Sequence, residues 1–489
     1  MRLGFQHSYA ALPGRFYARV DPTPVADPQL VVLNTPLAGD LGLEAEVVEP
    51  TAAAVFSGSE LPEDAMAIAM AYAGHQFGVF VPQLGDGRAI LLGELPGRDG
   101  VVRDLQLKGS GLTPFSRNGD GRAALGPMLR EYLVSEAMHA LGVPTTRSLA
   151  VVTTGEQVFR DRAALPGAVL TRVAASHVRV GTFQYFAARG DQDAVRELLG
   201  YVIGRHYPEA ADAGQPALTV LERVTQRQVA LVADWMLLGF IHGVMNTDNM
   251  AISGETIDYG PCAFMDEYDP RTVYSSIDHN GRYAYANQPL IAQWNLARFA
   301  ETLLFLIDPD PERAVSLATQ ILAPFIAQFD DRFLAGMRNK IGLFSAMDGD
   351  AGLIKRLLGA MQHAHADFTL TFHGLTLAAQ SSSEESHLRE LFAESAELDE
   401  WLRDWRSRLA RDPQTAAERV AAMRAVNPAV IPRNHRVQAV LDAADRGDYG
   451  PFRKLYAILK RPYDDQAGVA EYTRPPQPSE RVLQTFCGT

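Results

Sequence analysis

The stretch that decides the fold is His242-Gly-Val-Met-Asn-Thr-Asp-Asn249, followed nine residues later by Asp258-Tyr-Gly260. The first motif overlaps the most apolar run of the chain, residues 229–245, which we interpret as a buried helix that leads into a loop. Asn249 and Asp258 offer an amide oxygen and a carboxylate, which are hard ligands of the kind that Mg²⁺ prefers. The two motifs together therefore predict a metal-binding loop.

The spacing matches the protein kinase catalytic loop, H-x-D-x-x-x-x-N, and the D-F-G motif that follows it. With His242 aligned to the kinase histidine, Asn249 and Asp258 fall on the two metal-binding positions. The position of the catalytic aspartate holds Val244, which cannot accept a proton from a substrate hydroxyl. Asp248, four residues later, is the candidate proton acceptor. The alternative for Asp248 is a turn residue that bonds to the backbone.

Lysine is rare in this chain, which draws attention to Lys108. Only five of the 45 basic residues are lysines, and Lys108 is the only one among the first 339 residues. It ends a strand-like run, residues 104–108, as does the kinase lysine that holds nucleotide phosphates and pairs with a helix glutamate. Glu131, in the helix predicted from residue 126 to about 141, is the expected partner, and Glu136 is the fallback. An edge-strand lysine and solvated glutamates are the alternatives.

A pair of glycines precedes this strand. Gly85 and Gly87 lie in the turn of a hairpin predicted over residues 77–94, directly before Arg88. Glycines allow backbone N–H groups to approach phosphate oxygens, and Arg88 adds a positive charge. An ordinary turn is the alternative, because glycines are common in turns for backbone reasons.

A second glycine segment, residues 118–122, follows the lysine strand. It contains Asp120 and Gly121. We interpret it as a loop that folds over a nucleotide, and a tight polar turn is the alternative.

Two arginines lie where kinases begin their apolar slot for adenine. Arg172 ends a strand predicted over residues 168–174, and Arg179 follows it. Two arginines make a poor adenine slot but a good phosphate clamp. If both point inward, the nucleotide binds reversed, with its terminal phosphates in place of adenine and its α-phosphate presented for attack. Surface arginines are the alternative.

The order of predicted elements is that of a kinase N-lobe followed by a helical region. After the hairpin come strands at 101–108, 148–159 and 168–174, and helices are predicted at 191–205, 218–243, 288–307, 311–328, 350–365, 385–410 and 415–425, with a short hairpin at 250–257. We predict an α+β, protein-kinase-like bilobal fold. Its parts are an extended N-terminal wrap (1–60), an N-lobe (61–175), a C-lobe with the catalytic and metal motifs (176–310), and a helical C-terminal extension and tail (311–489).

Composition excludes several classes of protein. The net charge of −13 does not suit a nucleic-acid binder, which would show a basic face. The apolar run at 229–245 contains Asp234 and His242 and is short for a bilayer, so no membrane partner is expected. Two cysteines provide neither a disulfide framework nor a thiolate zinc site. A cytoplasmic protein is expected.

The combined motifs resemble the selenoprotein O family over most of the chain, from Phe16 onward. They are Tyr72-Ala-Gly-His-Gln-Phe-Gly78, Gln83-Leu-Gly-Asp-Gly-Arg88, Leu107-Lys-Gly-Ser-Gly111, Asn118-Gly-Asp-Gly-Arg122, the 242–249 motif and Asp258-Tyr-Gly260. The resemblance implies a kinase-like protein adenylyltransferase, which transfers AMP from a flipped ATP to protein hydroxyls. It implies nucleotide contacts at Gly85, Gly87, Arg88, Lys108, Asp120, Gly121, Arg172 and Arg179, a proton acceptor at Asp248, and metal ligands at Asn249 and Asp258.

The two cysteines, Cys262 and Cys487, suggest a redox latch. Cys262 lies four residues after Asp258, and Cys487 lies third from the end, where eukaryotic members of the resembling family carry selenocysteine. A disulfide between them would pin the tail near the metal motif. The alternative is that both remain reduced, with Cys262 a small buried residue.

We therefore expect a Mg²⁺- or Mn²⁺-dependent transfer of AMP from ATP to Ser, Thr or Tyr of protein substrates, with release of pyrophosphate. Two alternatives stay open. One is an ATP-dependent phosphotransferase with Asp248 as a displaced base, and the other is a catalytically inactive, nucleotide-binding pseudokinase scaffold.

Overall fold

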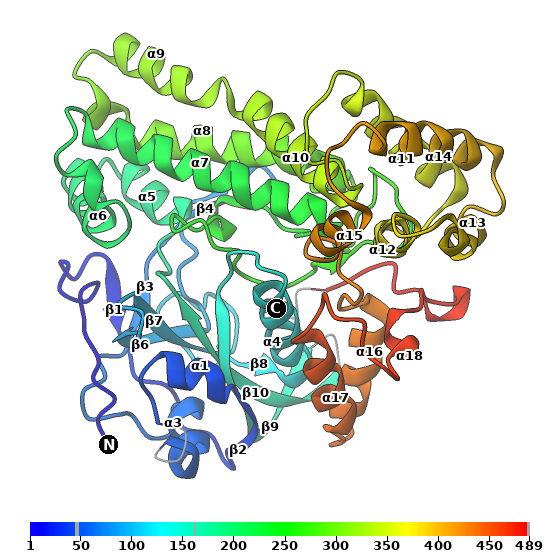
Figure 1. Cartoon of the computed structure of the whole chain (residues 1–489). Coiled ribbons are helices and arrows are strands. Elements are labelled where there is room, and N and C mark those ends of the chain that lie inside the picture. Colours follow the sequence, from blue (N-terminus) through cyan, green and yellow to red (C-terminus); the bar gives the residue numbers. More distant parts are fainter. Residues whose placement is uncertain (45–47, 161–162, 487–489) are drawn as a thin grey trace.

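The computed structural model describes residues 1–44, 48–160 and 163–486. Its N-terminal half is built on an eight-stranded antiparallel sheet with the order β1-β3-β6-β7-β10-β9-β2, in which β8 pairs with β10 (Figure 1). The strands are β1 (Tyr17–Arg19), β2 (Gln29–Leu33), β3 (Ile68–Met70), β6 (Ala89–Pro96), β7 (Val102–Lys108), β8 (Ala123–Ala124), β9 (Arg147–Arg160) and β10 (Ala163–Ala174). The mixed architecture confirms the α+β class.

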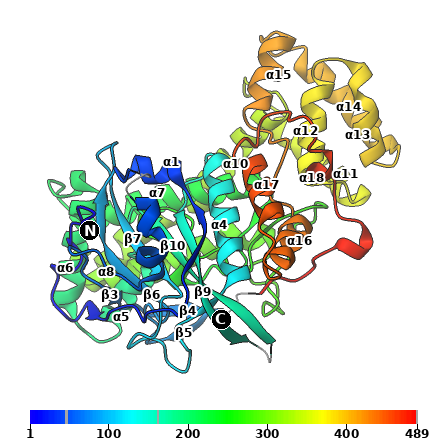
Figure 2. The ribbon, with the colours of Figure 1, turned by 90° about the horizontal axis from the view of Figure 1, so that it is seen from below.

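Alternating side chains let this sheet bury both faces. Val169 on β10 packs with Phe56 in one apolar cluster, and the next residue, Leu170, packs with Leu129 in another. Successive strand residues point to opposite faces, so one strand serves both clusters. The first face is covered by α1 (Thr35–Asp40) and α3 (Ala52–Ser57), after the short 3-10 helix η1 (Glu49–Thr51), and the second by α4 (Leu125–Ala140) (Figure 2).

The first sixty residues do more than wrap around the sheet, because they supply both of its edge strands, β1 and β2. The hairpin predicted over residues 77–94 is wrong. Instead, β5 (Val79–Val81) pairs with β4 (Gly74–Gln76), and β6 pairs with β3 and β7. The reason is that the N–H groups of Leu84 and Asp86 bond to the carbonyls of Tyr72 and Met70, which returns the chain beside β3.

The C-terminal half is helical. Its first group is α5 (Val180–Ala187), α6 (Gln192–His206), α7 (Pro216–Leu237), α8 (Gln288–Ile307), α9 (Pro311–Leu322) and α10 (Phe325–Lys340), with η2 (Pro208–Ala210) and η4 (Tyr285–Asn287). The helix predicted at 218–243 stops at Leu237, because Gly239 adopts a positive φ of 71° and β11 (Phe240–Ile241) follows. The helix predicted at 311–328 is two helices, because Pro324 interrupts it.

The loop between the two metal motifs departs from the predicted hairpin at 250–257. Ala251 forms a β-bridge with Arg179, and Thr256 forms one with Thr145. This segment therefore pairs with parts of the chain that are distant in sequence rather than with itself. The 242–249 motif contains the 3-10 helix η3 (Thr247–Asn249), and β12 (Ala263–Phe264) pairs with β11. The two motifs are thereby held side by side.

The remaining helices form the C-terminal extension. They are α11 (Asp350–Ala364), α12 (Phe368–Ala378), η5 (Ser382–Glu385), α13 (Ser386–Leu391), α14 (Ala396–Leu409), α15 (Ala416–Arg424), α16 (Asn434–Ala444), α17 (Gly450–Leu459), α18 (Ala470–Thr473) and η6 (Pro478–Glu480). The helix predicted at 385–410 is split at Ala393 and Glu394, which have positive φ. The chain then returns to the sheet, where α16 and α17 lie beside α4 (Figure 1). Tyr132 of α4 contacts Phe452 and Tyr456 of α17.

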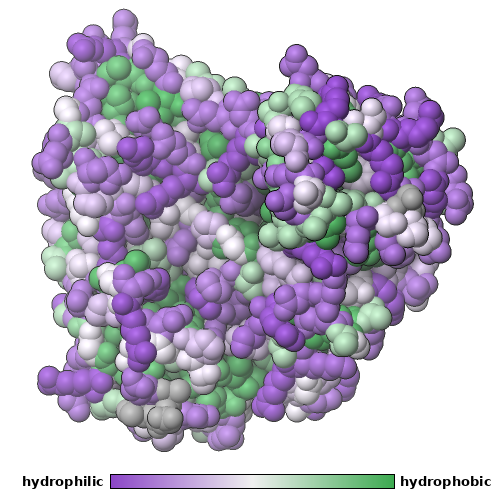
Figure 3. Space-filling view, in the orientation of Figure 1, coloured by the Kyte–Doolittle hydropathy of each residue, from purple (hydrophilic) through white to green (hydrophobic). Residues whose placement is uncertain are grey.

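One stretch, Tyr285–Ile307, is long and apolar enough to cross a membrane by length and composition alone, and half of its apolar window is buried inside the molecule. A core helix passes the same test, and Phe299 on this helix packs against Phe183 of α5. On the face in Figure 3, hydrophilic residues are interspersed with smaller hydrophobic patches.

Candidate functional site

A cavity of about 610 Å³ brings the predicted site residues together. Its walls come from both halves of the chain. They include the predicted nucleotide contacts, proton acceptor, metal ligands and first-choice lysine partner: Gly85, Gly87, Arg88, Lys108, Asp120, Gly121, Glu131, Arg172, Arg179, Asp248, Asn249 and Asp258. A second hollow of about 880 Å³, within residues 421–467, contains none of them. The first cavity is thus the candidate site, although it is the smaller one.

Asp258 is the centre of the charge network in this cavity. Its Oδ1 lies 2.8 Å from Lys108 Nζ and 2.7 Å from Arg172 Nη1, and its Oδ2 lies 3.0 Å from Arg179 Nη1. Lys108 Nζ also lies 2.6 Å from Glu131 Oε2, which is the predicted strand–helix ion pair. Three cations and two carboxylates therefore meet where the sheet faces the 242–260 segment.

The electrostatic state of Asp258 follows from these neighbours. Burial alone would raise the pKa of its carboxyl group, but Lys108, Arg172 and Arg179 lower that pKa well below the usual range. Asp258 is therefore ionised. Its φ of 63° lies in the left-handed region, where aspartate is tolerated better than most residues.

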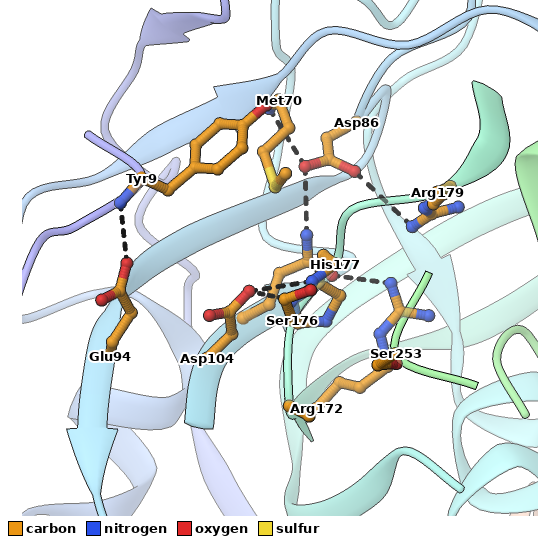
Figure 4. A network of polar contacts seen from close by, with 12 residues as sticks. Tyr9, Met70, Asp86, Glu94, Asp104, Arg172, Ser176, His177, Arg179 and Ser253 are labelled. Atoms are coloured by element: carbon orange, nitrogen blue, oxygen red, sulfur yellow. Dashed lines mark hydrogen bonds and ion pairs between the residues drawn. The ribbon is translucent and has the colours of Figure 1, made fainter. Parts of the chain in front are cut away.

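The two arginines are held from behind by a second polar layer. Arg172 Nη2 donates to Gln106 Oε1 at 2.6 Å, and Gln106 Nε2 donates to Asp86 Oδ2 at 3.0 Å. Asp86 Oδ1 lies 3.9 Å from Arg179 Nη2, and its Oδ2 also accepts from the Met70 backbone N–H (Figure 4). Burial raises the pKa of Asp86 to about 6. Asp86 and Gln106 thus connect the two guanidinium groups.

Asp248 lies in the loop opposite this network. Gln76 Nε2 donates to its Oδ2 at 3.2 Å, whereas Oδ1 is buried and bonds to nothing among the residues that the structure describes. Burial raises the pKa of Asp248 to about 6. His242, by contrast, is buried beneath the loop and contacts the Ile257 carbonyl at 2.9 Å through Nε2. One carboxylate oxygen of Asp248 therefore has no hydrogen-bond partner among the described residues.

The glycines permit the close approach of two loops. Gly85 has a φ of 75°, and a Cβ there would overlap the ring of Phe115, while a Cβ on Gly87 would lie 2.9 Å from the Phe115 carbonyl oxygen. Gly121 likewise has a positive φ of 69°, and a Cβ there would overlap the backbone of Gly111. The glycine-bearing segments therefore pack into one wall of the cavity.

Known proteins similar to this chain identify its family. Residues 1–460 match the family described as protein adenylyltransferase SelO. The chain belongs to this family. It is 62% identical over 486 residues to the protein nucleotidyltransferase YdiU of Rhizobium meliloti (strain 1021), and 63% identical over 487 residues to that of Bradyrhizobium sp. (strain BTAi1 / ATCC BAA-1182). Each alignment covers 99% of both chains.

Membership of the SelO family confirms the resemblance seen in the motifs and makes this chain a nucleotidyltransferase that transfers AMP. ATP is the substrate that such a transfer requires. The SelO family name also implies protein acceptors.

A divalent metal ion, which SelO-family chemistry implies, fits the donors present. Asn249 Nδ2 donates to the Val244 carbonyl at 3.0 Å, which orients the amide and leaves its oxygen available. The described residues contain no cluster of three or more His, Cys, Asp or Glu that would hold a metal ion alone. Mg²⁺ commonly binds one or two protein ligands together with substrate phosphates. Asn249 and Asp258 suit that mode of binding.

Sequence reasoning missed several residues of the site. Asp86 stands between the two predicted glycines, and Gln106 is a fully buried polar residue within an apolar strand. Tyr72 and Gln76 belong to the 72–78 motif. This motif contributed to the resemblance to the SelO family, but none of its residues was assigned a functional role. Gln106 could have been identified from the sequence, because it is a polar residue inside an apolar strand.

The remaining predictions concern Glu136, Asp120 and the two cysteines. Glu136 does not approach Lys108, because its carboxylate binds Arg147 at 2.7 Å. Asp120 pairs with Arg160 at 2.8 Å at the rim of the cavity. Cys262 is buried behind the metal motif, and Cys487 lies outside the described residues.

Proposed function

We propose that this enzyme binds ATP in a flipped orientation and transfers its AMP group to Ser, Thr or Tyr hydroxyls of proteins, releasing pyrophosphate. The observation that carries the proposal is the convergence of Arg172, Arg179 and Lys108 at one end of the cavity. Both arginine side chains are almost fully buried, with 2% and 3% exposure. Three cations meet two carboxylates here, so a purine base would leave positive charge unneutralised, whereas terminal phosphates would bind the cations.

The chemistry of transfer would use Asp248 as proton acceptor. The acceptor hydroxyl would donate to the carboxylate of Asp248, and its oxygen would attack the α-phosphorus. A new oxygen–phosphorus bond would form while the bond to the β-phosphate bridging oxygen breaks, and pyrophosphate would leave with the electron pair. Asp248 would take the hydroxyl proton. A metal ion held by Asn249 and Asp258, Mg²⁺ or Mn²⁺, would neutralise phosphate charge.

The kinase-like bilobal fold belongs to this proposal. The Lys108–Glu131 pair, at 2.6 Å, and the cavity that Asp248 and Asn249 line together with Asp258 support it. We keep the division into a wrap (1–60), an N-lobe (61–175), a C-lobe (176–310) and a helical extension (311–489). Gly85, Gly87, Arg88, Asp120 and Gly121 are proposed nucleotide contacts. The cytoplasmic location stays a prediction.

Labelled ATP tests the function directly. Label at the α-phosphate should appear on acceptor protein, and label at the γ-phosphate should not. Label from the γ position alone would indicate the phosphotransferase, and no label from either position would indicate the inactive scaffold. The Asp248→Asn variant is the control for label that binds without transfer, and mass spectrometry would identify the modified hydroxyl residues.

A further inference from the structure

We propose that residues 72–77, which comprise Tyr72, Ala73, strand β4 and Phe77, form a positioning strand that fixes Asp248 and Arg179 relative to each other. The proposal rests on the proposed function, in which Asp248 accepts the proton and Arg179 binds phosphate. The strand contributes no reacting atom. It holds the two groups that do the chemistry.

The positioning strand is docked on the catalytic loop through its backbone. The N–H of His75 donates to Thr247 Oγ1 at 2.7 Å, and the N–H of Phe77 donates to Asn246 Oδ1 at 3.1 Å. Gln184 of α5 completes the junction, because it accepts from Thr247 Oγ1 at 2.6 Å and contacts His75 Nδ1 at 2.9 Å. Asn246 and Thr247, the two residues directly before Asp248, are thereby tied to the positioning strand.

Two residues of the strand, Gln76 and Gly74, affect the carboxylate of Asp248. Gln76 Nε2 donates to Oδ2 at 3.2 Å and so orients the carboxylate, whereas Oδ1 has no partner among the described residues. Gly74 makes room for that oxygen, because a Cβ on Gly74 would overlap Oδ1 and lie 2.8 Å from Asp248 Cγ. The strand therefore sets both the orientation of the carboxylate and the space around it.

The same strand holds Arg179. The guanidinium carbon of Arg179 lies 4.5 Å from the centroid of the Tyr72 ring, and the N–H of Ala73 bonds to the Gly181 carbonyl at 2.9 Å. Arg179 Nη1 also donates to the backbone carbonyl of Asp248 at 2.9 Å. Stacking on an aromatic ring fixes the plane of a guanidinium group. One short segment thus determines the distance between the phosphate clamp and the proton acceptor.

The first test is steady-state kinetics of Gln76→Ala. Loss of the bond to Oδ2 should lower kcat by roughly 10- to 100-fold, as small misplacements of catalytic groups do. KM for ATP should stay within about twofold, because Gln76 does not touch Arg179 or Lys108. Val79→Ala, on the exposed part of β5 in the same hairpin, is the matched control and should match wild type. A wild-type kcat in Gln76→Ala overturns the proposal.

A double variant separates this proposal from the proposed function. If Gln76 acts through Asp248, Gln76→Ala should cause no further loss of kcat in an Asp248→Ala background. An equal loss in both backgrounds overturns the positioning role but leaves the proposed function intact. Full turnover of Asp248→Ala alone overturns the proposed function as well.

Gly74 and Tyr72 provide independent variants. Gly74→Ala should lower kcat without changing ATP affinity, and Gly200→Ala, where a Cβ on helix α6 would meet nothing within 4 Å, is its control. Tyr72→Leu should raise KM for ATP, and Tyr72→Phe, which keeps the ring, should restore it. Thermal melting of each variant would show that the fold is kept. A Gly74→Ala enzyme with wild-type kcat, or equal KM values for the two Tyr72 variants, contradicts the proposal.

Discussion

Arg172 Nη1 lies 2.7 Å from Asp258 Oδ1, and this pair crosses the cavity from strand β10 to the segment before β12. The guanidinium group is 2% exposed and the carboxylate is 21% exposed. A ligand that enters the cavity therefore meets the carboxylate first, with the guanidinium group behind it. This order suits the proposed roles of Asp258 as a metal ligand and Arg172 as a phosphate ligand.

Asp258→Ala should abolish both activity and binding of Mg²⁺-ATP. The substitution removes the anionic partner of Lys108, Arg172 and Arg179, so we also expect a loss of about 3–5 kcal/mol in the free energy of unfolding. Titration calorimetry with Mg²⁺-ATP and thermal melting would measure the two effects. Asp258→Asn, which preserves size and tolerates the φ of 63°, separates the loss of charge from the loss of volume. Wild-type affinity in Asp258→Asn would argue against a metal ligand here.

Asp248→Asn should keep ATP binding and lose turnover. The amide matches the carboxylate in size but cannot take a proton, so kcat should fall by roughly 10²- to 10⁴-fold. Single-turnover transfer from α-labelled ATP would measure the rate. Asp404→Asn changes an exposed side chain on helix α14. It is the control and should transfer AMP at the wild-type rate. If Asp248→Asn retained full turnover, another group would have to accept the proton.

Arg172→Ala and Arg179→Ala should each weaken ATP binding much more than adenosine binding. Both guanidinium groups should contact phosphates, so tripolyphosphate should lose affinity in parallel with ATP. Competition binding of the three ligands would show this pattern. Arg356→Ala, which removes an exposed arginine of α11, controls for general loss of positive charge. Equal weakening of adenosine and ATP would contradict the flipped orientation.

The redox latch between Cys262 and Cys487 stays a prediction, and the described part of the tail comes close to Cys262. Thr485 Oγ1 donates to the Pro261 carbonyl at 2.7 Å, and its N–H donates to the Tyr274 carbonyl at 2.7 Å, so the tail runs beside Cys262. Oxidised glutathione should produce a form of the wild type with altered mobility on a non-reducing gel, and Cys487→Ser should lack it. Activity of the wild type should respond to reductant. Two alkylated thiols after oxidation would refute the latch.

The C-terminal extension should lose stability in acid through Asp412. This buried carboxylate accepts from the N–H groups of Phe344 and Ser345 at 3.0 Å each, and from Ser345 Oγ at 2.8 Å. Burial opposes ionisation, but these bonds and Arg408 lower the pKa of Asp412 below its usual range. Because the folded-state pKa is depressed, its stabilisation is full above the unfolded pKa of about 3.9 and is lost as pH falls through the folded pKa.

Asp412→Asn should therefore lower the thermal midpoint at neutral pH, by an amount equivalent to about 1–3 kcal/mol. Its midpoint should also fall less than that of the wild type when the pH drops below about 4. Thermal melts from pH 7 to pH 2.5 would measure both, with exposed Asp404→Asn as the control. Parallel pH profiles for Asp412→Asn and wild type would contradict the assignment.

Glu131 and Glu136 show where sequence reasoning reaches its limit. Both glutamates lie on the predicted helix. The sequence did not determine which of them pairs with Lys108, because that depends on how the helix is rotated about its axis. Five residues turn an α-helix by about 140°, so only one of them can face Lys108. In the structure Glu131 faces Lys108, and Glu136 binds Arg147 and the side chain of Asn34. The packing of α4 against the sheet and α17 fixes that phase.

The sequence by itself determined the residues of the candidate site, because their types and spacing along the chain are local properties. His242, Asn249, Asp258 and Lys108 could be identified without knowing any contact. Only the tertiary structure decided that Gln76 and Tyr72 belong to the site and that β5 pairs with β4 rather than β6. Those relations join segments that are up to 172 residues apart, and they depend on hydrogen bonds that no local pattern encodes.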